Sequence, residues 1–283
     1  AALLFSALHG IAAMITAAVT DQHKHRAEVG PLAHTLAEAL RFSFPFGGVP
    51  LATLAISQAA SPIAPIVRIG GPLLLTYIVL QIGFLLTRLR DTETPNRSVH
   101  AALIAVVVVV LPIVGSIAPH GNNIGRSLNV AAVQGGGPQG TLAINTNSRD
   151  VVVRHLDATQ EIADGSAATG NQLDLVIWPE NVIDVSSFSS STERTEVAAQ
   201  AARLNAPFLV GITEDLDNKY FTNAQVVVNT DGSLGDRYDK VRRVPFGEFV
   251  PMRGLLEAVG APVDRIPRDA KAGKDTAILR AAD

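Results

Sequence analysis

Fourteen residues in the last quarter of the chain read Tyr238-Asp239-Lys240-Val241-Arg242-Arg243-Val244-Pro245-Phe246-Gly247-Glu248-Phe249-Val250-Pro251. The two prolines exclude a regular helix, because each lacks an N–H group and restricts the residue before it. Gly247 allows a backbone bend that other residues resist. We therefore expect Lys240 and Glu248 to lie on a shaped loop, where catalytic side chains are often found. Solvated surface charges are the alternative interpretation.

A second informative stretch lies about 60 residues earlier. Leu175-Val176-Ile177-Trp178 is a short apolar run with a β-branched centre, which predicts a buried strand. Pro179 ends the strand, and Glu180 follows just past its carboxyl end, where open α/β sheets place their ligands. Desolvation beside Trp178 and Pro179 is expected to raise the pKa of Glu180, which would suit proton transfer near neutral pH.

These two stretches together resemble the nitrilase superfamily of carbon-nitrogen hydrolases, which uses a Glu-Lys-Cys triad. The resemblance is carried by Trp178-Pro179-Glu180 and by the later pattern Tyr-x-Lys-x-x-x-Val-Pro-Phe-Gly-Glu-x-Val-Pro. The segment Asp236-Arg237-Tyr238-Asp239-Lys240 is a more specific signal, because it resembles the corresponding segment of the apolipoprotein N-acyltransferase branch. Members of that branch are integral-membrane enzymes of bacterial lipoprotein maturation.

Further segments match the same branch in colinear order. Val133-Gln134-Gly135, with Gln139 after Pro138, resembles the start of its soluble domain. A membrane-proximal part of it is similar to Pro45-Phe46-Gly47-Gly48-Val49-Pro50 and to Ser57-Gln58-x-x-Ser61-Pro62. The resemblance therefore covers nearly the whole chain.

The resemblance implies a fold and a set of site residues. We expect a multi-span α-helical membrane domain over residues 1–119, then an incomplete α/β nitrilase-like domain, an αββα sandwich, over residues 120–283. Covalent acyl transfer needs a nucleophile, a base and a group that stabilises the oxyanion. Glu180 is the candidate base, Lys240 the candidate oxyanion stabiliser, and Glu248 orients Lys240 or assists the base. Neither a cofactor nor a metal is expected.

The expected nucleophile is a cysteine, and the sequence contains none. In the family it lies on a strand that follows a segment like 265–283, so we expect the chain to be a fragment that lacks this strand and the first membrane spans. As given, it should be catalytically inactive. A cysteine within some 15 residues beyond Asp283 would support this interpretation.

The implied reaction moves an acyl chain from a phospholipid to the N-terminal amine of a diacylglyceryl-cysteine lipoprotein. The implied location is the inner membrane of a bacterium, with the nitrilase-like domain outside the cytoplasm. Two alternatives stay open. The chain could be a catalytically inactive lipid-binding or scaffold homologue, or it could be a membrane-tethered amidase. Multiple spans argue against the amidase.

The composition agrees with a membrane portion. The chain has 283 residues, of which 47% are hydrophobic and 17% charged, against about 25% charged in ordinary globular proteins. A net charge of −3 gives no reason to expect nucleic acid as a partner. His23 and His25 lack further ligands nearby, so they do not predict a metal site.

Four stretches have the length or apolar character of membrane helices. They are 1–20, 31–46, 69–87 and 101–119. The second carries Glu38 and Arg41, which lie three residues apart and should pair on one helix face. Residues 42–67 contain four prolines and predict a broken, interfacial segment, which the family resemblance would make a lipid entrance. Buried helices of a soluble core are the alternative interpretation.

Basic loops predict the orientation. Lys24 and Arg26 lie in one loop, and Arg88, Arg90 and Arg97 lie in another. Two spans separate these loops, so the positive-inside rule places both in the cytoplasm and everything after Pro119 outside it.

The remaining sequence predicts an alternation of strands and helices. Strands are expected at 128–133, 175–178, 208–212 and 225–228, and helices at 150–164 and 254–259. A capping box at Ser190-x-x-Glu193 should begin a helix that ends at Leu204. Asp231-Gly232 predicts a turn.

Overall fold

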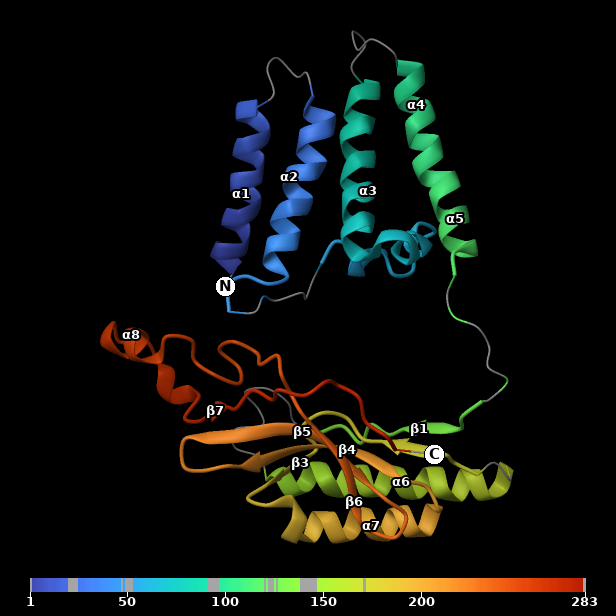
Figure 1. Ribbon diagram of the computed structural model, residues 1–283, viewed down its shortest axis with the longest axis vertical. Coiled ribbons are helices and arrows are strands. Elements are labelled where there is room, and N and C mark those ends of the chain that lie inside the picture. The colour runs from blue at the N-terminus through green and yellow to red at the C-terminus, as the bar shows by residue number, and fades with distance from the viewer. Residues whose placement is uncertain are drawn as a thin grey trace. The chain divides into compact units, whose positions relative to one another are not determined.

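The computed structural model describes residues 2–19, 25–46, 48, 53–90, 97–119, 121, 125, 127–137, 147–169 and 172–281. The chain divides into two compact units, Ala1–Asn123 and Ile124–Asp283 (Figure 1). Several sequence features named above lie outside the described residues: 21–24 and 91–96 of the two expected loops, Gly47, Val49 and Pro50 of the membrane-proximal match, and Pro138 and Gln139.

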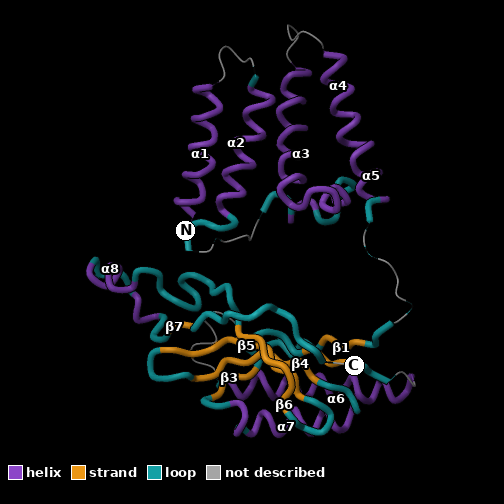
Figure 2. Tube along the Cα trace, viewed as in Figure 1, coloured by secondary structure: helices purple, strands orange, loops and turns teal. Residues whose placement is uncertain are grey.

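The first unit is helical. Its helices are α1 (Ala2–Val19), α2 (Arg26–Arg41), α3 (Val67–Arg90), α4 (Arg97–Ala105) and α5 (Leu111–Ile117), with a π-helical turn at Val106–Val110 joining the last two. Figure 2 shows them as a row of helices lying side by side. Within the unit α1 packs on α2, α2 on α3, and α3 on α4 and α5. Each of the four expected apolar stretches contains a helix, but in the second the helix ends at Arg41 and residues 42–46 form turns.

Two helices in the described part of the chain are long and apolar enough to cross a membrane. They span Ala64–Leu89 and Ser98–Ile117, whereas the apolar part of α1, Ser6–Val19, is shorter. Length and composition alone are weak evidence for a span, and a multi-span membrane domain stays a prediction.

The expected pairing within α2 is confirmed. Arg41 donates from Nε to Glu38 Oε2 at 2.9 Å and from Nη2 to Glu38 Oε1 at 2.8 Å. Between α2 and α3 the described residues form turns and two short 3-10 helices, Ile56–Gln58 and Ala64–Ile66, so the expected broken segment is confirmed as well. The backbone of α3 is interrupted at Gly70 and Gly71, just before Pro72.

The second unit is built on one mixed sheet. Its main strands, in spatial order, are β1 (Val130–Ala132), β2 (Leu175–Ile177), β4 (Phe208–Asp215), β5 (Tyr220–Val228) and β6 (Leu234–Asp239). The pairs β1–β2 and β2–β4 are parallel, and the pairs β4–β5 and β5–β6 are antiparallel. Two short strands extend it: β3 (Ile183–Val185) pairs with β4, and β7 (Asp269–Ala270) pairs with β5.

Two helices cover one face of this sheet, α6 (Ser148–Thr169) and α7 (Thr192–Leu204), as Figure 1 shows. The core between sheet and helices is apolar and includes Val152, Trp178, Val197, Phe208 and Val210, all 1% exposed or less. The short helix α8 (Arg253–Ala258) follows the sheet strands β1–β6 in sequence. The described residues thus form one sheet and one helical layer of a nitrilase-like α/β domain, and the four-layer αββα sandwich stays a prediction.

Some local predictions need correction. The helix α7 is capped by Ser191, whose hydroxyl accepts from the Arg194 N–H at 3.0 Å, so the predicted cap at Ser190 is wrong by one residue. Ser190 instead belongs to the preceding 3-10 turn, Phe188–Ser190. The sequence also gave no indication of β3, β6 or β7.

Candidate active site

The three predicted site residues converge in space. Lys240 Nζ donates to Glu180 Oε1 at 2.7 Å and to Glu248 Oε1 at 2.7 Å. Sixty residues separate Glu180 from Lys240 in sequence, so only the fold brings them together. This convergence is what two residues acting on one reacting group require.

Strand ends position the three side chains. Glu180 lies in the turn that follows β2, and Lys240 directly follows β6, where its N–H donates to the Asn223 carbonyl at 2.8 Å. Glu248 lies in the turn closed by the bridge between Pro245 and Phe249. Its second oxygen, Oε2, accepts from the Val244 N–H at 2.8 Å, which fixes the carboxylate against its own loop.

Asn223 is a fourth member that sequence reasoning missed. Its side-chain Nδ2 donates to Glu180 Oε1 at 2.7 Å and to Glu248 Oε1 at 2.9 Å. The residue is 5% exposed and lies within β5. Asparagine is depleted in strands, so an asparagine in the middle of an otherwise strand-like run was the signal that could have revealed it.

A glycine makes room for the turn that carries Glu180. A Cβ atom on Gly211 of β4 would lie 2.2 Å from the Pro179 carbonyl oxygen and 2.7 Å from Glu180 Cα. Real Cβ atoms essentially never come that close. Gly211 therefore lets the turn lie directly against β4.

The pKa of Glu180 differs from the sequence-based expectation. Burial alone would raise it, but hydrogen bonds from Lys240 and Asn223 and the charge of Lys240 outweigh burial and hold the pKa below its usual value. The expected rise is therefore wrong. For Lys240, burial alone would lower the pKa. Its hydrogen bonds to Glu180 and Glu248 outweigh burial and raise the pKa of Lys240 above its usual value. At neutral pH the site thus holds a carboxylate that can accept a proton beside a fixed ammonium cation.

A small cavity opens beside these groups. It has a volume of about 210 Å³ and is lined by Glu180, Asn223, Ala224, Gln225, Tyr238 and Lys240. Among the residues that the structure describes, no group of three or more His, Cys, Asp or Glu side chains could hold a metal ion. The arrangement can polarise a carbonyl group with the ammonium of Lys240 and can move a proton through Glu180.

Several apolar side chains in and just after the site loop are exposed. Val244 and Phe246, within the loop, are 48% and 53% exposed, and Met252 and Leu255, just after it, are 59% and 60% exposed. Exposed apolar side chains grouped in this way are typical of a surface that contacts an apolar partner.

Two family models match the chain. The model described as the apolipoprotein N-acyltransferase N-terminal domain matches residues 1–85, and the model described as carbon-nitrogen hydrolase matches residues 129–278. The first therefore falls within the helical unit and the second within the unit that holds the site.

Several individual relatives are named apolipoprotein N-acyltransferase. The relative from Mycolicibacterium smegmatis is 30% identical over 230 residues, which is 74% of this chain and 39% of that protein. The relative from Vibrio cholerae is 27% identical and covers 78% of this chain and 42% of its own length. The relative from Pseudomonas paraeruginosa is 27% identical, and the match covers 83% of this chain and 45% of that protein. The chain spans less than half the length of these relatives.

A comparison with solved structures gives only partial overlaps. The crystal structure of an N-terminal amidase aligns with a TM-score of 0.32 at 16% identity and covers 45% of this chain and 29% of that one. An overlap of this size carries no argument about function.

Proposed function

Because the chain belongs to the carbon-nitrogen hydrolase family, we propose that it holds the base and the cation of an acyltransferase site. The proposed reaction moves an acyl chain from a phospholipid to the N-terminal amine of a diacylglyceryl-cysteine lipoprotein. The relatives named apolipoprotein N-acyltransferase support this choice within the family. The observation that carries it is Lys240 held between Glu180 and Glu248 at 2.7 Å from each carboxylate.

In the proposed first half-reaction a cysteine thiol attacks the ester carbonyl of the phospholipid. Glu180 takes the thiol proton, and Lys240 donates to the oxyanion that forms on the carbonyl oxygen. The carbon–oxygen bond of the ester breaks, the lysophospholipid oxygen takes the proton back from Glu180, and a thioester remains. The lowered pKa keeps the Glu180 carboxylate ionised at neutral pH, so it can accept a proton, but pairing with Lys240 makes it a weaker base than an unpaired glutamate.

In the second half-reaction the α-amine of the lipoprotein attacks the thioester. Lys240 again stabilises the oxyanion, and Glu180 accepts the proton that the amine loses. The carbon–sulfur bond breaks as the amide forms, and the leaving thiolate takes the proton from Glu180. Glu248 and Asn223 keep Glu180 and Lys240 in place throughout. Glu248 accepts hydrogen bonds from Lys240 and Asn223, and Asn223 donates to the carboxylates of both Glu180 and Glu248. The 283 residues contain no cysteine, so this chain alone has no nucleophile for either step.

The membrane setting is part of the proposal. We propose that residues 1–119 form a multi-pass domain in the inner membrane of a bacterium and that residues 120–283 face away from the cytoplasm. The two span-length apolar helices and the exposed apolar side chains around the site loop support a substrate with a lipid tail.

The test compares this chain with a version extended by the cysteine-bearing strand of a family member. Incubation with phospholipid should build a thioester on the extended protein, visible by mass spectrometry, and an amine should discharge it. Glu180→Gln should block thioester formation because the base is lost while the size is kept. Lys240→Ala should slow it by the equivalent of about 3–4 kcal/mol, the usual loss for one oxyanion donor.

The control is the cysteine-free chain itself, which should transfer no acyl group above a heat-treated sample. Transfer by that chain would show that another residue is the nucleophile. An extended protein that binds phospholipid but forms no thioester would favour the alternative of an inactive lipid-binding homologue.

A further inference from the structure

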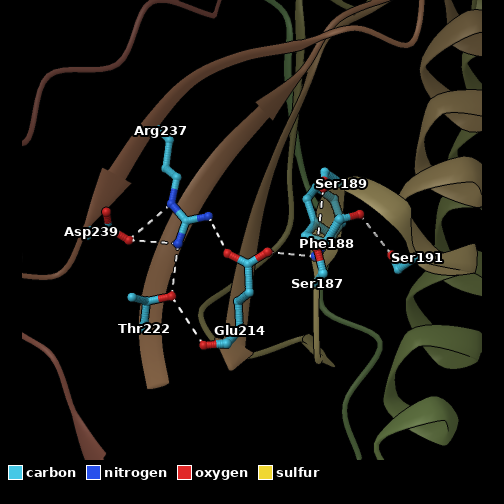
Figure 3. Close-up of polar contacts among 8 residues, drawn as sticks. All are labelled: Ser187, Phe188, Ser189, Ser191, Glu214, Thr222, Arg237 and Asp239. Atoms are coloured by element: carbon cyan, nitrogen blue, oxygen red, sulfur yellow. Dashed lines mark hydrogen bonds and ion pairs between the residues drawn. The ribbon is translucent and has the colours of Figure 1, made fainter. Parts of the chain in front are cut away.

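A polar network joins four segments of the second unit around one arginine (Figure 3). Arg237 of β6 donates from Nη1 to Glu214 Oε2 at 2.6 Å and from Nη2 to Thr222 Oγ1 at 2.9 Å. Its Nε and Nη2 also donate to Asp239 Oδ1 at 3.1 and 2.9 Å. The other oxygen of Glu214, Oε1, accepts from the Phe188 N–H at 2.7 Å.

This network lies on the opposite face of the sheet from the active site. Successive side chains of a strand point to opposite faces. Within β5, Thr222 belongs to the network and its neighbour Asn223 belongs to the site. Within and just after β6, Arg237 and Asp239 alternate with Tyr238 and Lys240, which line the site cavity.

Each end of the network is connected to a residue of the site. Asp239 directly precedes Lys240. Glu214 pairs with Val185, the last residue of β3, and β3 begins three residues after Glu180. The network therefore restrains both the strand end that carries Lys240 and the strand into which the Glu180 turn leads.

Backbone hydrogen bonds hold the end of β6, where the Lys240 N–H donates to the Asn223 carbonyl at 2.8 Å and the Gly273 N–H donates to the Lys240 carbonyl at 3.0 Å, but the strand is less regular at Arg237 itself. In the described sheet it pairs only with β5, and the pairing shifts register between Val226 and Val228. A bulge of this kind loosens a ladder locally. The planar guanidinium of Arg237 contacts side chains of β4, β5 and β6. It therefore fixes the relative positions of these strands where the backbone hydrogen bonds are irregular.

We propose that Arg237 is a positioning residue for the active site, which it serves from the far face of the sheet by holding Lys240 and Glu180 at hydrogen-bonding distance. The inference rests on the proposed roles of Glu180 and Lys240 and adds the residue that sets their separation.

The direction of the effect separates positioning from simple electrostatics. If Arg237 positions Lys240, its loss lets the ammonium leave its two carboxylates, which lowers the pKa of Lys240 and frees more amine. If Arg237 acted only through its charge, its loss would remove a neighbouring cation and leave Asp239 unpaired. Both changes would raise the pKa of Lys240 and leave less free amine.

The experiment measures the rate at which an amine-acylating reagent modifies Lys240 in the full chain between pH 7 and 10. The modified peptides are quantified by mass spectrometry, and the rate is divided by that of Lys219, an exposed lysine of the same unit. Trp178 is the one tryptophan of the sequence and is fully buried, so its fluorescence reports whether the second unit stays folded.

We expect Arg237→Gln and Glu214→Gln to raise the ratio about threefold, which corresponds to roughly half a pKa unit. Arg237→Lys keeps the positive charge but loses the planar guanidinium, and it should raise the labelling ratio as well. The matched control Arg203→Gln changes an exposed arginine of α7 that is hydrogen-bonded to Gln200, and should leave the ratio unchanged.

An unchanged or lower ratio in either Gln variant whose Trp178 fluorescence is native would overturn the proposal. If Arg237→Gln unfolds the unit, Glu214→Gln decides, since it is nearly isosteric. The readout follows the ionisation of Lys240 and needs no acyl transfer. The positioning role of Arg237 can therefore fail this test while the proposed acyltransferase function stands, and it can pass the test if the proposed function fails.

Discussion

Gly211 shows how one missing side chain shapes the site. The turn at Pro179 and Glu180 lies against β4 so closely that a methyl group on residue 211 would overlap three of its backbone atoms. Backbone atoms cannot turn aside as a flexible side chain can. A larger residue must therefore displace either the strand or the turn that carries Glu180.

We predict that Gly211→Ala destabilises the second unit by about 1–3 kcal/mol, the usual cost of overpacking, and lengthens the contact between Glu180 and Lys240. Unfolding in urea, followed by Trp178 fluorescence, measures the first effect, and the labelling rate of Lys240 measures the second. Gly254→Ala is the matched control, because a Cβ there meets nothing within 4 Å and the residue lies in α8. Equal stability of the two variants would contradict the prediction.

The individual residues differ in how much the sequence reveals of them. Glu180 and Glu248 could be predicted because they follow Pro179 and Gly247, and Lys240 could be predicted because it belongs to the same family-like pattern as Glu248. Asn223 was missed: an asparagine within a strand-like run was its only signal, and its contacts with two carboxylates depend on how the strands pair. The direction of the Glu180 pKa was wrong for the same reason: the expectation counted burial and lacked the Asn223 and Lys240 hydrogen bonds.

At the scale of elements, long apolar segments were predicted well and short polar ones were not. The strands β4 and β5 contain apolar runs whose centres are buried on both faces. In contrast β6 reads Leu-Gly-Asp-Arg-Tyr-Asp, is mostly exposed, and is held by its neighbour and by Arg237. The strands β3 and β7 have three and two residues, too few for any periodic pattern.

The helix α2 carries a buried ion pair that can be tested as a unit. Glu38 is 3% exposed and accepts two hydrogen bonds from Arg41. We predict that Glu38→Leu alone destabilises the helical unit by about 3–5 kcal/mol, because it leaves a buried guanidinium without its carboxylate. The double change Glu38→Leu with Arg41→Met should recover most of this loss, since it removes both charges from the low-dielectric interior.

Thermal unfolding of the first unit in detergent measures both variants, with circular dichroism at the helical wavelengths as the signal. A single variant as stable as the unchanged chain would show that the pair contributes nothing. A double variant no better than the single one would show that Arg41 has a role beyond neutralising Glu38.

At the scale of the whole molecule, the two units differ in their surfaces. The helical unit exposes apolar residues along its length, among them Ile11, Met14, Ile15, Val109, Ile113 and Ile117, each at least 46% exposed. A water-soluble protein rarely exposes so many large apolar side chains on neighbouring helices. The second unit buries large apolar side chains between sheet and helices and exposes others both around the site loop and elsewhere, for example Leu128, Leu216 and Ile278.

This contrast leads to a prediction about topology. Arg26 lies at the start of α2 and Arg97 at the start of α4, whereas Arg88 and Arg90, expected in a loop, belong to the last turn of α3. Basic residues at the ends of apolar helices favour the cytoplasmic side. A reporter active only outside the cytoplasm should therefore be silent when fused after residue 95 and active when fused after residue 235. A reporter active only in the cytoplasm, fused at the same positions, serves as the matched control and should give the reverse pattern. Activity of the first reporter after residue 95 and its silence after residue 235 would reverse the orientation. In that case the candidate active site would face the cytoplasm, and the proposed lipoprotein acceptor outside the membrane would have to be abandoned.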